Sequence, residues 1–232
     1  MCTLTYLPQP DEQGYLLTVN RDESIQRPPA TAPALYHLAQ GKAVVFPRDE
    51  AAGGTWIAFN DNRAVCLLNG AFISHNRQSS GYKRSRGLVL LDSFDYIDIK
   101  AFVEKYDFNN IEPFTIISIT HQLPQNKLCE IRWDGNKVYY KEMEPHVPQI
   151  WSSATLYEPE TVLLRQKWFE TWLEEQKKPF ESDSIVHFHR TAGDGNPLRN
   201  LIFDKGNGQK TLSITQIVKD AHTTLMQYWS LR

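Results

Sequence analysis

Apolar residues along this chain gather in short strand-like runs that come in pairs, with turn-forming residues between the members of each pair. Short runs rich in β-branched and aromatic residues predict β-strands, and Pro, Gly, Asn or Asp between two runs predict antiparallel hairpins. Four such pairs stand out: 2–6 with 15–19, 55–59 with 64–68, 128–133 with 137–140, and 211–218 with 223–229. The strongly β-branched run 114–120 predicts a further buried strand, and 149–153 predicts a short one.

Helical spacing of apolar residues is found in three segments. Two of them, 86–94 and 98–106, are short, whereas 158–176 predicts a long helix that ends before Pro179. Its expected apolar face consists of Val162, Leu163, Trp168, Phe169, Trp172 and Leu173. Because the order lacks a strand–helix–strand rhythm, we expect an α+β fold of antiparallel strands rather than a parallel sheet. The absence of an internal repeat or linker predicts a single domain over residues 1–232.

Composition narrows the class of protein. The chain is 41% hydrophobic and 22% charged with a net charge of −2, which is typical of a globular protein and offers no basic surface for nucleic acid. No apolar run reaches the roughly 20 residues of a membrane-spanning helix, and no leader pattern begins the chain, so we expect a cytoplasmic protein. Three cysteines without metal spacing fit a reducing compartment and predict neither a disulfide framework nor a metal site.

The first predicted hairpin suggests a candidate reactive site at the start of the chain, because it places Asn20, Arg21 and Asp22 beside Cys2. A Met before a small residue is usually trimmed, which would leave Cys2 with a thiol and a free α-amine. An α-amine has a pKa near ~7.7–8.0, so it can serve as the general base for its own thiol. A nearby Arg favours the thiolate, and a nearby Asp can hold the amine. The alternative is a small buried cysteine at the start of an edge strand.

Three further positions are candidates for contact with a ligand. Asn69 could donate a hydrogen bond to a developing oxyanion, or it could simply belong to a turn. Trp56 follows a double glycine that would let the backbone approach a ligand, with the indole as a pocket wall; the alternative is a tight turn and a core Trp. Arg86 could pair with a ligand carboxylate or phosphate, or serve as a structural charge. Patterns for a serine-hydrolase elbow, a phosphate-binding loop or a dinucleotide site are absent.

Several of these motifs together resemble the transport and Golgi organisation protein two family, also called the NRDE family after its tetrapeptide. The matching residues are Cys2, Asn20-Arg21-Asp22-Glu23, Arg27-Pro28, Gly53-Gly54-Thr55-Trp56 and Ser85-Arg86-Gly87. The resemblance implies an N-terminal-nucleophile (Ntn) hydrolase fold, a four-layer αββα sandwich with two antiparallel sheets. It also implies a relation to the choloylglycine and penicillin V acylase group of amide hydrolases.

The resemblance implies two functions for a pocket at Cys2. The first, which we expect, is binding and trafficking of haem or a similar small hydrophobic ligand, with His75, His121, His187, His189 or a Cys as candidate axial ligand. The second is a cysteine Ntn amidohydrolase that cleaves an amide of a small acyl compound through a Cys2 acyl-enzyme and requires no cofactor. The catalytic candidates are Cys2, Arg21, Asp22 and Asn69, and the ligand-binding candidates are Asn20, Trp56, Arg86 and Ser153.

One residue departs from the family pattern. Ser153 stands where the family usually has Asn and where related hydrolases supply a second oxyanion donor, so that donor and the enzymatic activity stay open. The sequence leaves the natural ligand and the oligomeric state undetermined.

Overall fold

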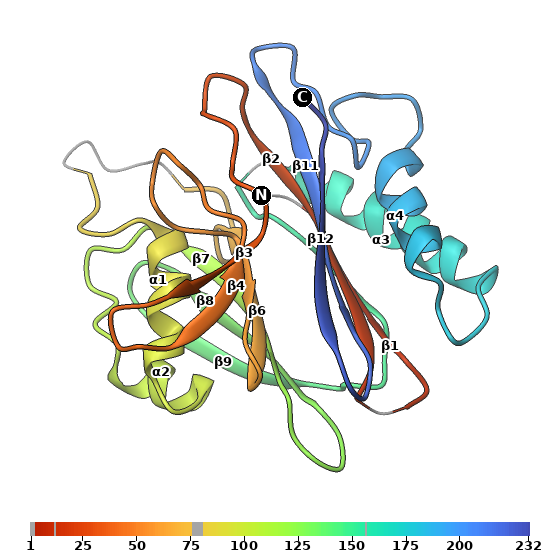
Figure 1. Cartoon of the computed structure of the whole chain (residues 1–232). Coiled ribbons are helices and arrows are strands. Elements are labelled where there is room, and N and C mark those ends of the chain that lie inside the picture. The colour runs from red at the N-terminus through yellow and green to blue at the C-terminus, as the bar shows by residue number, and fades with distance from the viewer. Residues whose placement is uncertain (1–2, 12, 76–80, 156) are drawn as a thin grey trace. The chain divides into compact units, whose positions relative to one another are not determined.

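The chain forms two compact units, each with its own antiparallel sheet and helices (Figure 1). The computed structural model describes residues 3–11, 13–75, 81–155 and 157–232, so Cys2 lies outside the described residues. The first unit comprises residues 1–27 and 146–232, and the second comprises residues 28–145. The α+β class and the two antiparallel sheets expected from the sequence are confirmed. The single domain stays a prediction.

The sheet of the first unit has five strands in the order β10-β1-β2-β11-β12. Their bounds are β1 (Thr3–Pro8), β2 (Tyr15–Ser24), β10 (Gln149–Ser152), β11 (Gln209–Lys219) and β12 (Thr224–Ser230). Both predicted hairpins of this unit, β1 with β2 and β11 with β12, are confirmed. Thr3, the first described residue, pairs with Asn20 on one side and with Ser152 on the other. The strand that carries the NRDE tetrapeptide therefore lies inside the sheet, between β1 and β11.

A bulge in β11 sets the register opposite the tetrapeptide. Asp22 is paired with Thr211 and Arg21 with Ser213, so one residue of β11 between them is left without a counterpart. Bulges bend a strand and redirect side chains, and they are common beside functional sites. This bulge decides which hydroxyl groups face Arg21 and Asp22.

Two helices belong to this unit, α3 (Pro159–Glu174) and α4 (Ser182–Thr191) (Figure 1). The predicted long helix is confirmed as α3, but the expected apolar face is wrong at Leu163, which is exposed, and Arg165 is fully buried instead. We did not predict α4. Its apolar residues span only one turn and are interrupted by His and Arg, which leaves too short a pattern to identify a helix.

A hydrophobic cluster lies between these helices and strands β1 and β2. Its buried members are Leu7, Leu16, Phe169, Phe180, Ile185, Phe188 and Leu201. Burial of one such aliphatic or aromatic side chain contributes roughly 1.5–3 kcal/mol, so the cluster holds α3 and α4 against the sheet. This packing fixes the helix residues that reach the polar groups of β1 and β2.

The sheet of the second unit has seven strands in sequence order, from β3 to β9. Their bounds are β3 (Ala34–His37), β4 (Ala43–Phe46), β5 (Ile57–Phe59), β6 (Arg63–Asn69), β7 (Phe114–Thr120), β8 (Lys127–Trp133) and β9 (Val138–Met143). The hairpins β5 with β6 and β8 with β9, and the buried strand β7, are confirmed. We predicted neither β3 nor β4 as a strand.

Two short helices of this unit separate β6 from β7. They are α1 (Arg86–Asp92) and α2 (Ile99–Lys105), with a 3₁₀ turn at Ser93–Asp95 between them. Ser85 caps α1 by accepting from the Leu88 N–H, and Asp98 caps α2 by accepting from the Ala101 N–H. The 3₁₀ turn ends the first predicted helix two residues early. No helix among the described residues has the length and apolar character that crossing a bilayer requires.

Candidate functional site

The Asp22 carboxylate is the centre of a buried polar site in the first unit. The side chain is 3% exposed, although an isolated buried carboxylate would be very unfavourable. Its Oδ1 accepts from the Thr211 hydroxyl at 2.5 Å, and its Oδ2 accepts a short hydrogen bond from the Tyr157 hydroxyl. Hydroxyl donors from β11 and from the segment before α3 thus hold both oxygens.

Arg21 is the next residue of β2, and its side chain leaves the opposite face of the sheet. Successive side chains of a strand alternate, and Asn20 and Asp22 both contact the side that α3 and α4 cover. Arg21 is 3% exposed and is paired in register with Ser213. The Ser213 hydroxyl is buried and has no hydrogen-bond partner among the described residues. Arg21 and Asp22 are adjacent in the sequence, but in the structure their side chains lie on opposite faces of the sheet.

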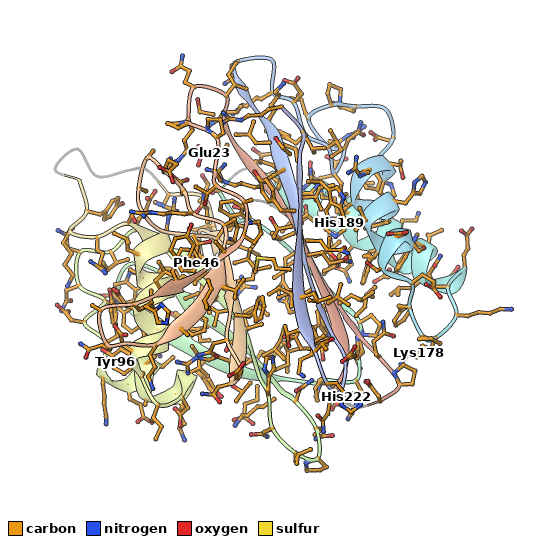
Figure 2. The ribbon with its side chains drawn as sticks, viewed as in Figure 1. Glu23, Phe46, Tyr96, Lys178, His189 and His222 are labelled. Carbon is orange, nitrogen blue, oxygen red and sulfur yellow. The ribbon has the colours of Figure 1, made fainter. Side chains whose placement is uncertain are left out.

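Asn20 is locked into a second network with α4. Its Nδ2 donates to the carbonyls of His189 at 3.2 Å and Leu201 at 2.7 Å, so its Oδ1 must accept the Nδ1–H of His189 at 2.7 Å. The His189 Nε2 is then unprotonated and accepts from the Thr5 hydroxyl at 2.8 Å. Both nitrogens of this fully buried ring are occupied, and Figure 2 shows His189 on α4 beside the sheet.

Arg165 supplies a buried positive charge to the same side of the sheet. Its guanidinium donates to the Thr3 hydroxyl at 2.7 Å and to the carbonyls of Arg199 and Asn200. It also lies 3.7 Å from the centre of the Tyr157 ring. Burial, with this guanidinium as a second cause, lowers the pKa of His189 to about 3, which keeps the imidazole neutral.

Sequence reasoning missed most of this network. We considered His189 only as a metal or haem ligand, and we did not include Tyr157, Arg165 or Thr211 among the candidate site residues. One signal was available: Arg165 occurs within the apolar spacing of the predicted helix, four residues before Phe169. A charged residue at such a position often indicates a buried polar contact.

Ser153 also belongs to this unit. It follows Ser152, the partner of Thr3 across β10 and β1, and it is fully buried. Its hydroxyl lies 3.2 Å from the Thr155 hydroxyl. Ser153 therefore lies next to the residue that pairs with Thr3, the first described residue of β1.

The remaining predicted site residues, Asn69, Trp56 and Arg86, belong to the second unit. Asn69 ends β6 opposite Phe114 and is partly buried, and Gly70, which follows it, has a positive φ. Trp56 is 1% exposed, as expected for a core side chain.

Arg86 is engaged within the protein. Its Nη2 lies 3.2 Å from a carboxylate oxygen of Glu112, and its Nη1 donates to the Pro113 carbonyl at 3.2 Å. His75 lies 3.4 Å from the other oxygen of Glu112. These contacts are those of a structural charge.

The glycine motifs of this unit have a steric explanation. A Cβ on Gly54 would lie 2.5 Å from the carbonyl carbon of Gly87, and a Cβ on Gly87 would lie 2.7 Å from the Thr55 oxygen. Thr55 N–H also donates to the Gly87 carbonyl at 3.2 Å. The two motifs are glycine-rich because two backbone segments touch there, and only glycine allows so close an approach.

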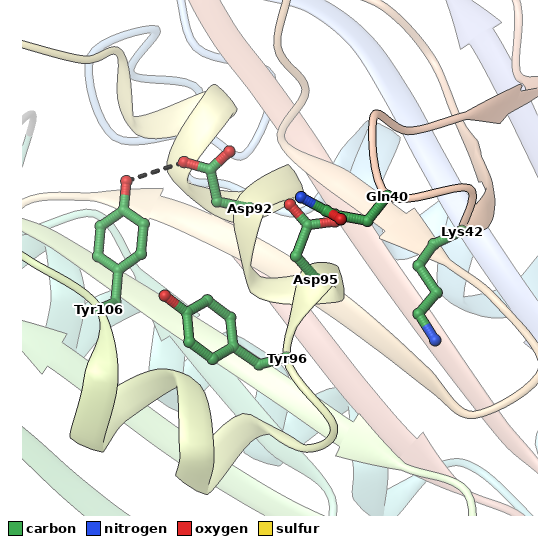
Figure 3. A pocket seen from close by; sticks show the side chains of 6 residues that line it. All are labelled: Gln40, Lys42, Asp92, Asp95, Tyr96 and Tyr106. Carbon is green, nitrogen blue, oxygen red and sulfur yellow. Dashed lines mark hydrogen bonds between the residues drawn. The ribbon is translucent and has the colours of Figure 1, made fainter.

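A polar pocket of about 520 Å³ opens on the second unit (Figure 3). Its lining residues are Gln40, Lys42, Asp92, Asp95, Tyr96 and Tyr106. Tyr106 donates to Asp92 at 2.8 Å, and Arg84 pairs with the same carboxylate. Burial, followed by the charge of Asp92, raises the pKa of Asp95. Because the charged groups of this surface largely neutralise one another, we assign no chemistry to the pocket.

The other two cysteines have the character of core residues. Burial raises the pKa of the Cys129 thiol to about 12 and raises that of Cys66 further. Neither thiol is therefore reactive near neutral pH. Across the described part of the chain, no cluster of His, Cys, Asp and Glu has the composition of a metal site.

Comparison with known proteins agrees with this architecture. A Caenorhabditis elegans N-acylethanolamine-hydrolyzing acid amidase ortholog has a similar solved structure, with a TM-score of 0.64, 14% identity and coverage of 100% of both chains. At that identity the likeness concerns the fold, and it confirms the expected Ntn-hydrolase-like fold. No curated protein matches the sequence. The family model for Transport and Golgi organisation 2 matches residues 1–214, and the chain therefore belongs to that family.

Proposed function

We propose that this protein is an Ntn amide hydrolase in which Cys2 is the nucleophile. The observation that carries the proposal is the Asp22 carboxylate, which is buried and held by two hydroxyls, two residues after Asn20, the strand partner of Thr3. A protein that only enclosed an apolar ligand would gain little from a buried, oriented carboxylate at this position, because its desolvation is unfavourable. A hydrolase would use it to orient an amine.

The positions of Arg21 and Asp22 along β2 suggest separate roles for the two side chains. Arg21 and Asp22 are successive residues of β2, so their side chains leave opposite faces of the sheet and can serve different groups. Arg21 would then support the thiolate or the substrate, and Asp22 would orient the α-amine.

The proposed reaction transfers one proton at a time through the α-amine. The amine accepts the thiol proton while sulfur attacks the amide carbonyl carbon, and the resulting ammonium gives that proton to the leaving nitrogen as the C–N bond breaks. Water then attacks the thioester with the amine as base, which releases the acid and restores the thiol. Ser153, which belongs to the same unit as Asp22, is our candidate oxyanion donor.

The structural comparison supports the choice of reaction class. The similar structure is described as an acid amidase that hydrolyses N-acylethanolamines, so the same fold carries amide hydrolysis in that protein. We accordingly propose an amide of a small acyl compound as substrate class.

Haem trafficking, the function that we expected from the sequence, receives less support from the described histidines. His189 has both ring nitrogens occupied and is fully buried, so it does not suit an axial ligand. His121 and His75 do not oppose ligation: His121 Nδ1 is 2.9 Å from the Asp61 carbonyl and His75 Nε2 is 3.4 Å from Glu112, and metal-ligating histidines commonly make such a contact through their other nitrogen. His187 is exposed on α4. The pocket of Figure 3 belongs to the second unit, and four of its six lining residues, Gln40, Lys42, Asp92 and Asp95, are polar or charged and not aromatic.

The decisive experiment measures the state of Cys2 and its chemistry in one preparation. Intact mass should show that Met1 has been removed, and iodoacetamide should add one carbamidomethyl group to Cys2. A panel of N-acyl amides should then be hydrolysed by the wild type and not by Cys2→Ala. A mature protein that retains Met1 would exclude the mechanism, because the free amine would not be on Cys2. Haem titration of the same sample tests the carrier: a saturable shift of the absorbance band without amide hydrolysis would favour it.

A further inference from the structure

Tyr157 connects the buried cation of the first unit with the buried carboxylate. It lies between β10 and α3, is 8% exposed, and donates its hydroxyl proton to Asp22. One face of its ring meets the Arg165 guanidinium at 3.7 Å, and Phe203 packs against it edge to face at 5.6 Å. The ring is therefore held independently of the hydrogen bond that its hydroxyl makes.

The guanidinium strengthens that hydrogen bond. A cation over an aromatic ring draws electron density from it, which makes a phenol a better hydrogen-bond donor. Arg165 is itself immobilised by hydrogen bonds to Thr3, Arg199 and Asn200. Because Arg165 holds the Tyr157 ring in place, the Tyr157 hydroxyl can hold the Asp22 carboxylate within the narrow range of orientations that a reactive site requires.

We propose that Tyr157 is a positioning residue that holds the Asp22 carboxylate in the orientation that receives the α-ammonium of Cys2. This inference rests on the proposed function for the identity of the group that Asp22 orients. The phenol keeps its proton throughout: when the thiol proton passes to the amine, the new ammonium is stabilised by Asp22, and Tyr157 continues to donate to that carboxylate. Tyr157 touches neither the substrate nor the sulfur.

Thr211 also donates to Asp22, but its contribution is harder to isolate. Its hydroxyl accepts from the Phe203 N–H at 2.9 Å, so its removal would disturb the backbone as well. Tyr157→Phe removes a single oxygen and keeps the ring between Arg165 and Phe203. The tyrosine is therefore the cleaner position for a test.

The test compares two variants that each remove one tyrosine–aspartate hydrogen bond. Tyr157→Phe removes the bond to Asp22, and Tyr106→Phe removes the 2.8 Å bond to Asp92 in the second unit. The readout is the pH dependence of Cys2 alkylation by iodoacetamide, followed by intact mass. Because Cys66 and Cys129 are buried with raised pKa values, Cys2 is the thiol that reacts.

We expect Tyr157→Phe to move the alkylation midpoint to higher pH by about 0.5–1 unit. A loosened Asp22 stabilises the neighbouring ammonium less, and the thiolate beside that ammonium is then less favoured. Tyr106→Phe should leave the midpoint at its wild-type value. In an Asp22→Asn background, Tyr157→Phe should add no further shift, because its effect passes through Asp22.

The outcomes separate this inference from the proposed function. An alkylation midpoint that Tyr157→Phe leaves unchanged, in a variant with native circular dichroism, would overturn the role of Tyr157 even if the wild type hydrolyses amides. A Tyr157-dependent midpoint in a protein that hydrolyses no amide would retain that role and remove the reaction. If Tyr157→Phe shifts the alkylation midpoint by the same amount in the Asp22→Asn background, the proposed role of Tyr157 is also overturned.

Discussion

The central strands of the two sheets bury different kinds of residue. In the first unit, nearly half of the buried positions of β1, β2 and β11 are polar: Thr3, Thr5, Thr18, Asn20, Arg21, Asp22, Thr211, Ser213, Thr215 and Gln216. In the second unit, the central strands β6, β7 and β8 bury mainly apolar residues: Ala64, Val65, Cys66, Leu67, Leu68, Ile116, Ile117, Ile119, Leu128, Cys129 and Ile131. Both sheets are antiparallel, so strand geometry does not explain the difference.

The difference shows which unit is organised around polar chemistry. A buried polar group is tolerated only with hydrogen-bond partners, so each polar residue in the first sheet requires a matching residue elsewhere. Helices α3 and α4 supply several of them, and hydrophobic packing fixes those helices. The second unit instead has several of its ion pairs at the surface, such as Lys83 with Asp107 and Lys127 with Glu142. Four predictions test this contrast.

The largest loss of folding stability should follow removal of the buried Arg165 guanidinium. Arg165→Ala leaves two carbonyls and the Thr3 hydroxyl without their donor, and we expect a loss of about 3 kcal/mol or more in the free energy of unfolding. Arg84→Ala breaks an ion pair with Asp92 whose arginine side chain is 41% exposed, and should lose less than about 1 kcal/mol. Urea unfolding of both variants measures the difference. Equal losses would contradict the contrast between the units.

Acid should destabilise the first unit through His189. Its pKa is lowered to about 3 in the folded protein, against an ordinary value of 6.5, so between these values the unfolded chain binds a proton that the folded chain does not. Stability is therefore retained above pH 6.5 and lost as the pH falls toward 3. The loss is about 1.4 kcal/mol per pH unit, or roughly 2.5 kcal/mol at pH 4.5.

Two histidine variants isolate that contribution. His189→Gln should lower stability at pH 7 and lose most of the slope between pH 6.5 and 4.5. His187→Gln, an exchange at an exposed position of the same helix, should keep the slope. Urea midpoints measured across this pH range give both slopes, and a wild-type slope in His189→Gln would show that other groups cause it.

Disturbing the close backbone contact between Gly54 and Gly87 in the second unit should cause an intermediate loss of stability. Gly54→Ala places a Cβ 2.5 Å from a backbone carbon of Gly87, and we expect a loss of about 2 kcal/mol. Gly53→Ala meets no atom closer than 3.9 Å but has φ of +69°, and should lose about 1 kcal/mol. Thermal unfolding distinguishes the two. Neither variant should change Cys2 alkylation, and a change in Gly54→Ala would indicate that the motif serves the site directly.

The smallest effect concerns the two hydroxyls beside the bulge. Ser213→Ala removes a buried hydroxyl that has no partner among the described residues, so stability should be unchanged or rise by about 0.5 kcal/mol. Thr211→Val removes hydrogen bonds to Asp22 and to the Phe203 N–H, and should lose about 1–2 kcal/mol. Urea unfolding compares them. A clear loss in Ser213→Ala would reveal an interaction of that hydroxyl.

The candidate site was only partly predictable from the sequence. Asn20, Arg21 and Asp22 were found because one hairpin returns them to the start of the chain, and a hairpin depends on residues close in sequence. Their partners are distant: Tyr157 is 135 positions from Asp22, His189 is 169 from Asn20, and Thr211 is 189 from Asp22. No local pattern connects residues so far apart.

By itself, the sequence determined most of the strands and hairpins, the long helix α3 and the family, because alternation, turn residues and short motifs are local properties. The tertiary structure decided that Arg21 and Asp22 leave opposite faces, that Arg165 is buried, and that glycines 54 and 87 touch. The physical reason is that a buried polar or backbone contact is stable only when its partner arrives from elsewhere in the chain. Which distant residue becomes that partner depends on how the whole unit packs, and the neighbouring residues in the sequence do not determine it.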